Sequence, residues 1–139
     1  MGLPGAGKTT LASALKQYLE EYDISVDWFN ADTIRKQFND WDFTRDGRIR
    51  QSLRMLELAK NSTNDVVICD FVAPLPEMRE NFSPDILIWM DTISSSSYAD
   101  TNSVFVPPDA FDFKISEQYA EKWAAIVGIH ILDRLLKLN

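Results

Sequence analysis

The chain opens with Met1-Gly2-Leu3-Pro4-Gly5-Ala6-Gly7-Lys8-Thr9-Thr10, and this stretch decides the fold. It matches the pattern G-x-x-x-x-G-K-[ST] without a gap, and an apolar helical pattern follows it at once. Glycines in such a loop let successive backbone N–H groups point at phosphate oxygens, and the start of the helix adds partial positive charge. We therefore predict that all nine residues from Gly2 to Thr10 bind a nucleoside triphosphate. The alternative is a glycine-rich N-terminal arm without a ligand.

Within this loop, Lys8 and Thr9 have distinct expected roles. Lys8 is placed to reach the β- and γ-phosphates of ATP and is a catalytic candidate, while the Thr9 hydroxyl is a ligand for Mg²⁺. Asp70 follows the apolar run 66–69 and is a second candidate for holding Mg²⁺, usually through water. The alternative for Asp70 is a hydrogen bond at the end of a strand.

The start of the chain is unusual for a loop of this kind. Such loops normally follow a buried strand, and here only Met1 precedes Gly2. Without that strand we expect a slot about 4.8 Å wide in the sheet and unpaired backbone on both sides. The chain could be a truncated fragment, the sheet could be closed by another segment, or the protein could be a degenerate one that has lost the strand. We favour truncation, and we expect that about six apolar residues added before Met1 raise the melting temperature.

Composition narrows the classes of protein to consider. The chain has 139 residues, of which 45% are hydrophobic and 25% charged, as in a soluble globular protein with one domain over residues 1–139. A net charge of -7 disfavours a nucleic-acid partner. The single cysteine, Cys69, is expected to be a buried thiol, which indicates a reducing cytoplasm. No long apolar run or signal peptide indicates a membrane protein.

Apolar periodicity predicts alternating helices and strands. We expect helices at about 9–22, 33–38, 44–61 and 116–138, and strands at 24–29, 66–69, 85–90 and 111–115. The strand at 66–69 is a continuous apolar run, typical of burial on both faces. Residues 91–108 show no helical period and are expected to form a loop. The alternation predicts an α/β fold of the P-loop NTPase type, with three layers and a parallel sheet whose first strand is absent.

Asp32 and Arg35 form a D-x-x-R element directly after the predicted strand at 24–29. This is the end of a parallel sheet where ligands bind. A carboxylate there can orient a substrate hydroxyl for attack on the γ-phosphate, so Asp32 is the second catalytic candidate. The alternative is that Asp32 caps the next helix. Arg35 and Arg48 are candidates for binding an anionic substrate, although either arginine alone could simply be solvated.

Four segments together resemble the adenylylsulfate kinase family in order and spacing. They are the loop from Gly2 to Ala12, Asn30-Ala31-Asp32-Thr33-Ile34-Arg35, Phe43-Thr44 with Arg48 and Gln51, and Phe71-Val72-Ala73-Pro74 with Arg79. That family moves the γ-phosphate of ATP to the 3′-hydroxyl of adenylyl sulfate. The resemblance implies that Asp32 meets the acceptor hydroxyl and that Phe43 stacks on the substrate adenine. It also implies that Arg35, Arg48, Gln51 and Arg79 bind the substrate.

The chain departs from that family at several positions. The Asp-Gly-Asp of the family is Asn30-Ala31-Asp32 here, its Glu-Asn is Arg50-Gln51, and a serine often found in it is Ala73. The long lid rich in Lys and Arg is almost absent, because residues 91–108 contain neither residue type. A lid supplies cations and excludes water, so we expect weak activity unless another arginine such as Arg79 compensates.

Two other functions stay open at this point. The chain could be a P-loop kinase for a different hydroxyl, such as a polynucleotide 5′-end or a small metabolite, although the acidic charge opposes a polynucleotide. It could also be a degenerate module that binds ATP without turnover. The expected partner is a small nucleotide substrate. The sequence does not decide the oligomeric state, and a homodimer is one of the states that it allows.

Overall fold

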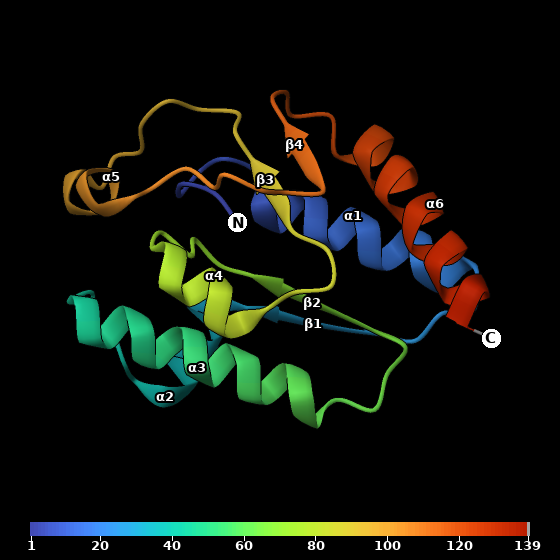
Figure 1. The fold of residues 1–139 in the computed structure, drawn as a ribbon, viewed down its shortest axis with the longest axis horizontal. Helices are drawn as coiled ribbons and strands as arrows, with labels where there is room; N and C mark the ends of the chain where they lie inside the picture. The colour runs from blue at the N-terminus through green and yellow to red at the C-terminus, as the bar shows by residue number, and fades with distance from the viewer. Residues whose placement is uncertain (139) are drawn as a thin grey trace.

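The computed structural model describes residues 1–138, in which helices and parallel strands alternate (Figure 1). The helices are α1 (Lys8–Glu21), α2 (Ala31–Phe38), α3 (Arg45–Asn61), α4 (Pro76–Phe82), α5 (Ala99–Val104) and α6 (Ala120–Leu138). The strands are β1 (Val26–Asn30), β2 (Val66–Asp70), β3 (Ile88–Met90) and β4 (Phe113–Ile115). This arrangement confirms the predicted α/β fold.

The strands form two parallel pairs. β1 pairs with β2 from Val26↔Val66 to Asn30↔Asp70, so that the polar ends of both strands lie side by side. β3 pairs with β4. Figure 1 shows α1 and α6 together on one side of the strands, and α2, α3 and α4 on the other. The prediction of one parallel sheet is therefore corrected in one respect, because β2 and β3 are not paired with each other in the described residues.

The main core lies where α1 packs against α6 and the strands. Leu11, Leu15 and Leu19 follow one face of α1 at four-residue steps and are all buried. Gly128 of α6 lets the two helices approach closely, since a Cβ atom there would lie 2.3 Å from the Tyr18 ring. This packing fixes α1, and with it the loop that precedes α1.

Two capping residues set the helices that follow β1. Thr44 accepts a hydrogen bond from the Gly47 N–H at 3.2 Å, so α3 begins where the sequence predicted. Asn30 caps α2, its side-chain oxygen accepting from the Thr33 N–H at 3.1 Å. The alternative that Asp32 caps this helix is therefore wrong, and Asp32 lies exposed in the first turn of α2.

Two predictions for the C-terminal third of the chain are wrong. Residues 91–108, expected to be a loop, include α5, which buries only Thr101 and so gives no apolar period in the sequence. Hydrogen bonds between Ser96 and Asn102 hold the approach to this helix. The last helix begins at Ala120, four residues later than the predicted start at residue 116, because β4 ends at Ile115 and an irregular segment separates the two.

Burial of β2 also differs from expectation. The sequence predicts that residues 66–69 and the Cys69 thiol are buried, but they are only half-buried. The reason is that β1 pairs one edge of β2 while the other edge has no partner strand among residues 1–138.

None of the helices in residues 1–138 combines the length and apolar character needed to cross a membrane.

Candidate nucleotide and acceptor site

The loop Gly2–Gly7 adopts a backbone that glycine permits. Gly5 and Gly7 have φ values of 86° and 98°, in the left-handed region that other residues rarely adopt. Ala6 at the centre is fully buried, and its carbonyl accepts a hydrogen bond from the Thr92 hydroxyl at 2.7 Å. The loop is thus held against the end of β3, and α1 begins directly after it at Lys8.

Lys8 lies across this loop. Its ammonium Nζ donates a hydrogen bond to the Leu3 carbonyl oxygen at 2.9 Å. Burial lowers the pKa of Lys8, while the carboxylates Asp70 and Asp32 act in the opposite direction. The cation therefore contacts the loop and is attracted by the two carboxylates that the sequence predicts for Mg²⁺ and for the acceptor hydroxyl.

Thr9, Asn30 and Asp70 form a hydrogen-bonded cluster at the ends of β1 and β2. The Thr9 hydroxyl donates to Asp70 Oδ2 at 2.9 Å, and Asn30 Nδ2 donates to the same oxygen at 2.9 Å. Asp70 is buried, with 5% of its surface exposed. The structure thus brings both predicted metal ligands together, and Asp70 also makes the strand-end hydrogen bonds of the alternative interpretation.

The donor atoms of this cluster suit Mg²⁺, which prefers oxygen ligands and keeps several waters. Residues 1–138 contain no group of three or more His, Cys, Asp or Glu side chains able to hold a metal. An ion beside Thr9 and Asp70 would therefore need phosphate oxygens and water to complete its coordination.

Arg35 of α2, Phe43 of the following loop and Arg48 of α3 form a second cluster. The Arg35 guanidinium carbon lies 4.4 Å from the centre of the Phe43 ring, and that of Arg48 lies 5.5 Å from it. Both arginines are buried, whereas 45% of Phe43 is exposed. Nearly half of the Phe43 surface is therefore accessible, and two cations lie over its ring.

Backbone carbonyls hold both arginines in place. Arg35 donates to the carbonyls of Asp40 and Asp42 at 3.0 and 3.2 Å, and burial lowers its pKa. Arg48 Nε donates to the Phe43 carbonyl at 2.8 Å, and its second nitrogen donates to the Thr101 hydroxyl of α5 at 3.1 Å. The segment that stands where the family has a lid therefore contacts the candidate substrate site through Arg48.

Gln51 links this cluster to the turn that carries Asp32. Its amide Nε2 donates to the Ala31 carbonyl at 3.1 Å, and its oxygen accepts from Arg54 at 2.7 Å. Arg54 and Arg50 both bind Asp40, and their hydrogen bonds hold the pKa of the Asp40 carboxyl far below its usual range. The buried Gln51 is thus a positioning residue for the start of α2.

Arg79 is arranged differently from the other predicted substrate residues. Its guanidinium donates to the carbonyls of Ala73, Pro74 and Val106, and it lies 5.7 Å from the Phe105 ring. It ties the segment after β2 to the segment after α5, and the structure does not place it in the Arg35–Phe43–Arg48 cluster.

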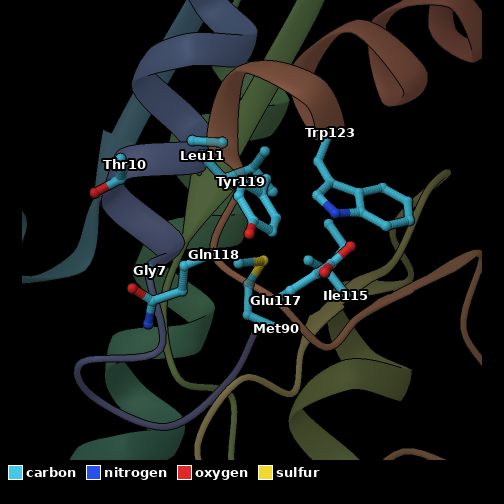
Figure 2. A pocket seen from close by; sticks show the side chains of 10 residues that line it. Gly7, Thr10, Leu11, Met90, Ile115, Glu117, Gln118, Tyr119 and Trp123 are labelled. Atoms are coloured by element: carbon cyan, nitrogen blue, oxygen red, sulfur yellow. The ribbon is translucent and has the colours of Figure 1, made fainter.

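A small pocket beside the loop was not predicted from the sequence. Its volume is about 100 Å³, and Gly7, Thr10 and Leu11 line one side. Figure 2 shows Tyr119 and Trp123, from the C-terminal segment, around the same space. No motif marks these residues, and the only signal in the sequence is an aromatic pair at helical spacing, which is typical of a core.

Known proteins are similar to this chain in sequence and in fold. A probable adenylyl-sulfate kinase from Aeropyrum pernix is 35% identical over 81 residues, and an adenylyl-sulfate kinase from Halothermothrix orenii is 34% identical over 82. These alignments cover 56–57% of this chain and 44% of each relative, so the match spans less than half the length of these curated relatives.

A solved structure, the Mycobacterium tuberculosis APS kinase in complex with AMPPNP and APS, has the same fold. It is 21% identical, with a TM-score of 0.78 over 96% of this chain and 94% of that one. Residues 1–88, which contain the loop and both side-chain clusters, match the sequence model of the adenylylsulphate kinase family. The chain therefore belongs to the adenylylsulphate kinase family.

Proposed function

We propose that this protein is an ATP-dependent adenylylsulfate kinase, which transfers the γ-phosphate of ATP to the 3′-hydroxyl of adenylyl sulfate. The observation that carries the proposal is that β1 and β2 end at one edge, beside which lie the Lys8 loop and the exposed Asp32. The Arg35–Phe43–Arg48 cluster is formed by α2, the loop that follows it and the start of α3. The Mycobacterium tuberculosis APS kinase was solved in complex with both AMPPNP and APS, which supports two ligands on this fold.

On the nucleotide side, the N–H groups of the loop and the start of α1 would hold the phosphates. Lys8 would exchange its bond to the Leu3 carbonyl for the β- and γ-phosphates, where its charge stabilises the transferring group. Thr9 and Asp70 would hold Mg²⁺, which neutralises phosphate charge when it is bound. The aromatic side chains Tyr119 and Trp123 lie where an adenine could rest against the mouth of the small pocket.

On the acceptor side, the two arginines supply charge and Phe43 supplies a stacking surface. Adenylyl sulfate carries a planar adenine and a phosphosulfate anion, so it matches both features. Asp32 would accept a hydrogen bond from the 3′-hydroxyl and orient it toward the γ-phosphate. Because phosphoryl transfer has a loose transition state, this orientation contributes more than the strength of the base.

The proposal is tested by comparing acceptors. The purified chain, MgATP and adenylyl sulfate should give 3′-phosphoadenylyl sulfate, identified by chromatography against the 2′-isomer. AMP, adenosine and a 5′-hydroxyl oligonucleotide, offered at the same concentration, should give at least about tenfold less product, because they lack the sulfate or a matching anion. Equal turnover with another acceptor would overturn the assignment in favour of a kinase for that acceptor.

One observation favours a second candidate, a module that binds ATP without transferring phosphate. Residues 91–108 contain no Lys or Arg, and Arg79 is engaged with backbone carbonyls, so neither supplies a mobile cation. This candidate predicts binding of MgATP that Lys8→Ala abolishes, together with no product from any acceptor in the assay above.

A further inference from the structure

Thr92 and Gln118 reach the phosphate loop from the end of the β3–β4 pair. The Thr92 hydroxyl donates to the Ala6 carbonyl at 2.7 Å, and the Gln118 amide Nε2 donates to the Gly5 carbonyl at 3.4 Å. The same amide donates to the Thr92 hydroxyl oxygen at 3.3 Å, so this hydroxyl accepts one hydrogen bond and donates another. Two successive carbonyls of the loop are thus bound by residues 86 and 113 positions further along the chain.

The paired strands hold these two residues in place. Asp91 directly follows β3, and its N–H donates at 2.8 Å to the carbonyl of Ile115, the last residue of β4. This bond fixes the backbone immediately before Thr92. Gln118 lies three residues after the end of β4, and Figure 2 shows its side chain extending toward the Gly7 end of the loop. Both side chains therefore contact the loop from a fixed part of the structure.

The contact with Ala6 sets the direction of one peptide group. Ala6 is fully buried, so water does not readily replace a hydrogen bond lost by its carbonyl. The peptide bond between Ala6 and Gly7 is trans, and in a trans peptide the carbonyl and the N–H point in opposite directions. Because the Ala6 carbonyl points at Thr92, the Gly7 N–H points away from Thr92.

The Gly7 N–H belongs to the donors that we expect to bind phosphate. Gly7 is the N-cap of α1 and directly precedes the first turn, whose N–H groups have no partner within the helix. Its φ of 98° is left-handed, and in such a turn successive N–H groups can converge on one anion. A rotation of the Ala6–Gly7 peptide would turn this donor away from the anion, and the Thr92 hydroxyl opposes that rotation.

We propose that Thr92 is a positioning residue for nucleotide binding, whose hydroxyl holds the Ala6–Gly7 peptide so that the Gly7 N–H faces the phosphates. This inference rests on the nucleotide site of the proposed function and adds to it a residue outside the loop motif. Thr92 contacts the carbonyl side of the loop, so it acts through the backbone and not on the nucleotide itself. Gln118 supports it through the longer hydrogen bond to its oxygen.

The experiment compares Thr92→Val and Thr92→Ser in the full chain. Valine keeps the shape of threonine without the hydroxyl, whereas serine keeps the hydroxyl. Displacement of a fluorescent ATP analogue by MgATP measures affinity at a temperature at which every variant is folded. Thr92→Val should weaken MgATP binding about tenfold, and Thr92→Ser should stay within about twofold of the unsubstituted chain. Equal affinities of Thr92→Val and the unsubstituted chain would overturn the proposal.

Ser25→Ala is the control for a general loss of stability. The Ser25 hydroxyl donates to Asp65 at 3.0 Å, at the end of β1 and β2 opposite to the loop. Ser25→Ala also removes a hydroxyl hydrogen bond, but it should leave the affinity for MgATP unchanged. A loss of affinity equal to that of Thr92→Val would overturn the proposal, since the effect of Thr92 would then be one of stability alone.

Magnesium tripolyphosphate separates the loop from the neighbouring pocket. Gln118 lines the small pocket together with Tyr119, so a change in ATP affinity by itself does not distinguish phosphate from base. Because tripolyphosphate has no base, Thr92→Val should weaken its binding by the same factor as that of MgATP. Undiminished binding of tripolyphosphate would overturn the proposal.

The Gly7 amide reports on the donor itself. Saturating MgADP should move its proton resonance in the unsubstituted chain and in Thr92→Ser, and much less in Thr92→Val; an equal shift in Thr92→Val would overturn the proposal. These readouts measure binding, so the proposal can fail while transfer to adenylyl sulfate is observed, and it can hold where transfer is not. A folded chain that bound neither MgATP nor tripolyphosphate would overturn both this proposal and the proposed nucleotide site.

Discussion

The carboxyl end of β2 and its free edge are only a few residues apart, but they are built in opposite ways. At the end, Asp70 is buried and accepts hydrogen bonds from Thr9 and Asn30. Along the edge, the peptide groups of Val67 and Cys69 face a cavity. Side chains complete the first region, whereas the second borders a cavity of about 650 Å³ between β2 and β3.

The difference teaches that the Thr9–Asn30–Asp70 cluster and the unpaired edge of β2 are stabilised separately. The hydrogen bonds of this cluster join α1, β1 and β2, and none of them involves β3. We therefore expect substitutions in the site to change turnover with little effect on unfolding. Substitutions that line the cavity between β2 and β3 should instead change unfolding with little effect on turnover. The predictions below follow this division, from the largest expected effect to the smallest.

Lys8→Ala should lower the proposed phosphate transfer by about 10³-fold or more, because it removes the cation placed for the β- and γ-phosphates. The melting temperature should change by less than about 3 °C. Lys16→Ala is the matched control, since Lys16 lies two turns along the same helix in an exposed pair with Glu20. Similar losses in both variants would contradict a specific role for Lys8.

Asp32→Asn should lower kcat by about 10²–10³-fold, with little change in the KM for adenylyl sulfate, because the carboxylate orients a hydroxyl and does not hold the ligand. Steady-state kinetics at saturating MgATP measure both constants. Asp46→Asn serves as control, because Asp46 occupies the equivalent first turn of α3. A rise in KM without loss of kcat would show instead that Asp32 binds the acceptor.

Phe43→Ala should raise the KM for adenylyl sulfate about tenfold, since base stacking on an aromatic ring contributes about 1–3 kcal/mol. The KM for ATP should not change. Phe38→Ala provides the comparison, because Phe38 is similarly exposed and stacks on Arg54 at 4.2 Å outside the Arg35–Phe43–Arg48 cluster. An equal effect of both substitutions would place the adenine elsewhere.

Stability of the unextended chain should depend on pH through the Met1 amino group, whose pKa burial lowers from 8.0 to about 5. Between these values the unfolded chain binds a proton that the folded chain does not. The free energy of unfolding should therefore fall as pH drops from 8 to 5, by on the order of 1 kcal/mol because Met1 is only half-buried. Urea titrations should show a flatter profile for the N-acetylated chain, and identical profiles would refute this account.

Much of the N-terminal half could be predicted from the sequence. The loop, the Thr44 cap and the polar ends of β1 and β2 each have a local signal, either a motif, a capping residue or the end of an apolar run. The topology of a parallel pair then brings Thr9 and Asp70 together without further information.

Other features have no local signal. α5 buries a single threonine, and its place depends on the contact of Thr101 with Arg48, which lies 53 residues earlier. The role of Arg79 as a link between two segments depends on carbonyls, which any residue supplies. Half-burial of β2 depends on which strand lies beside it, and the apolar run 66–69 would look the same in either case.

The most direct test of this division measures turnover of adenylyl sulfate by the unextended chain and by a chain extended by about six apolar residues before Met1, each corrected for its folded fraction. We predict kcat values within about threefold of each other, although the extended chain melts at a higher temperature, because the hydrogen bonds of the Thr9–Asn30–Asp70 cluster do not involve β3. Lys8→Ala should abolish product in both forms. Turnover by the extended chain together with none by the folded, unextended chain would contradict the account, since it would show that the site depends on the added segment.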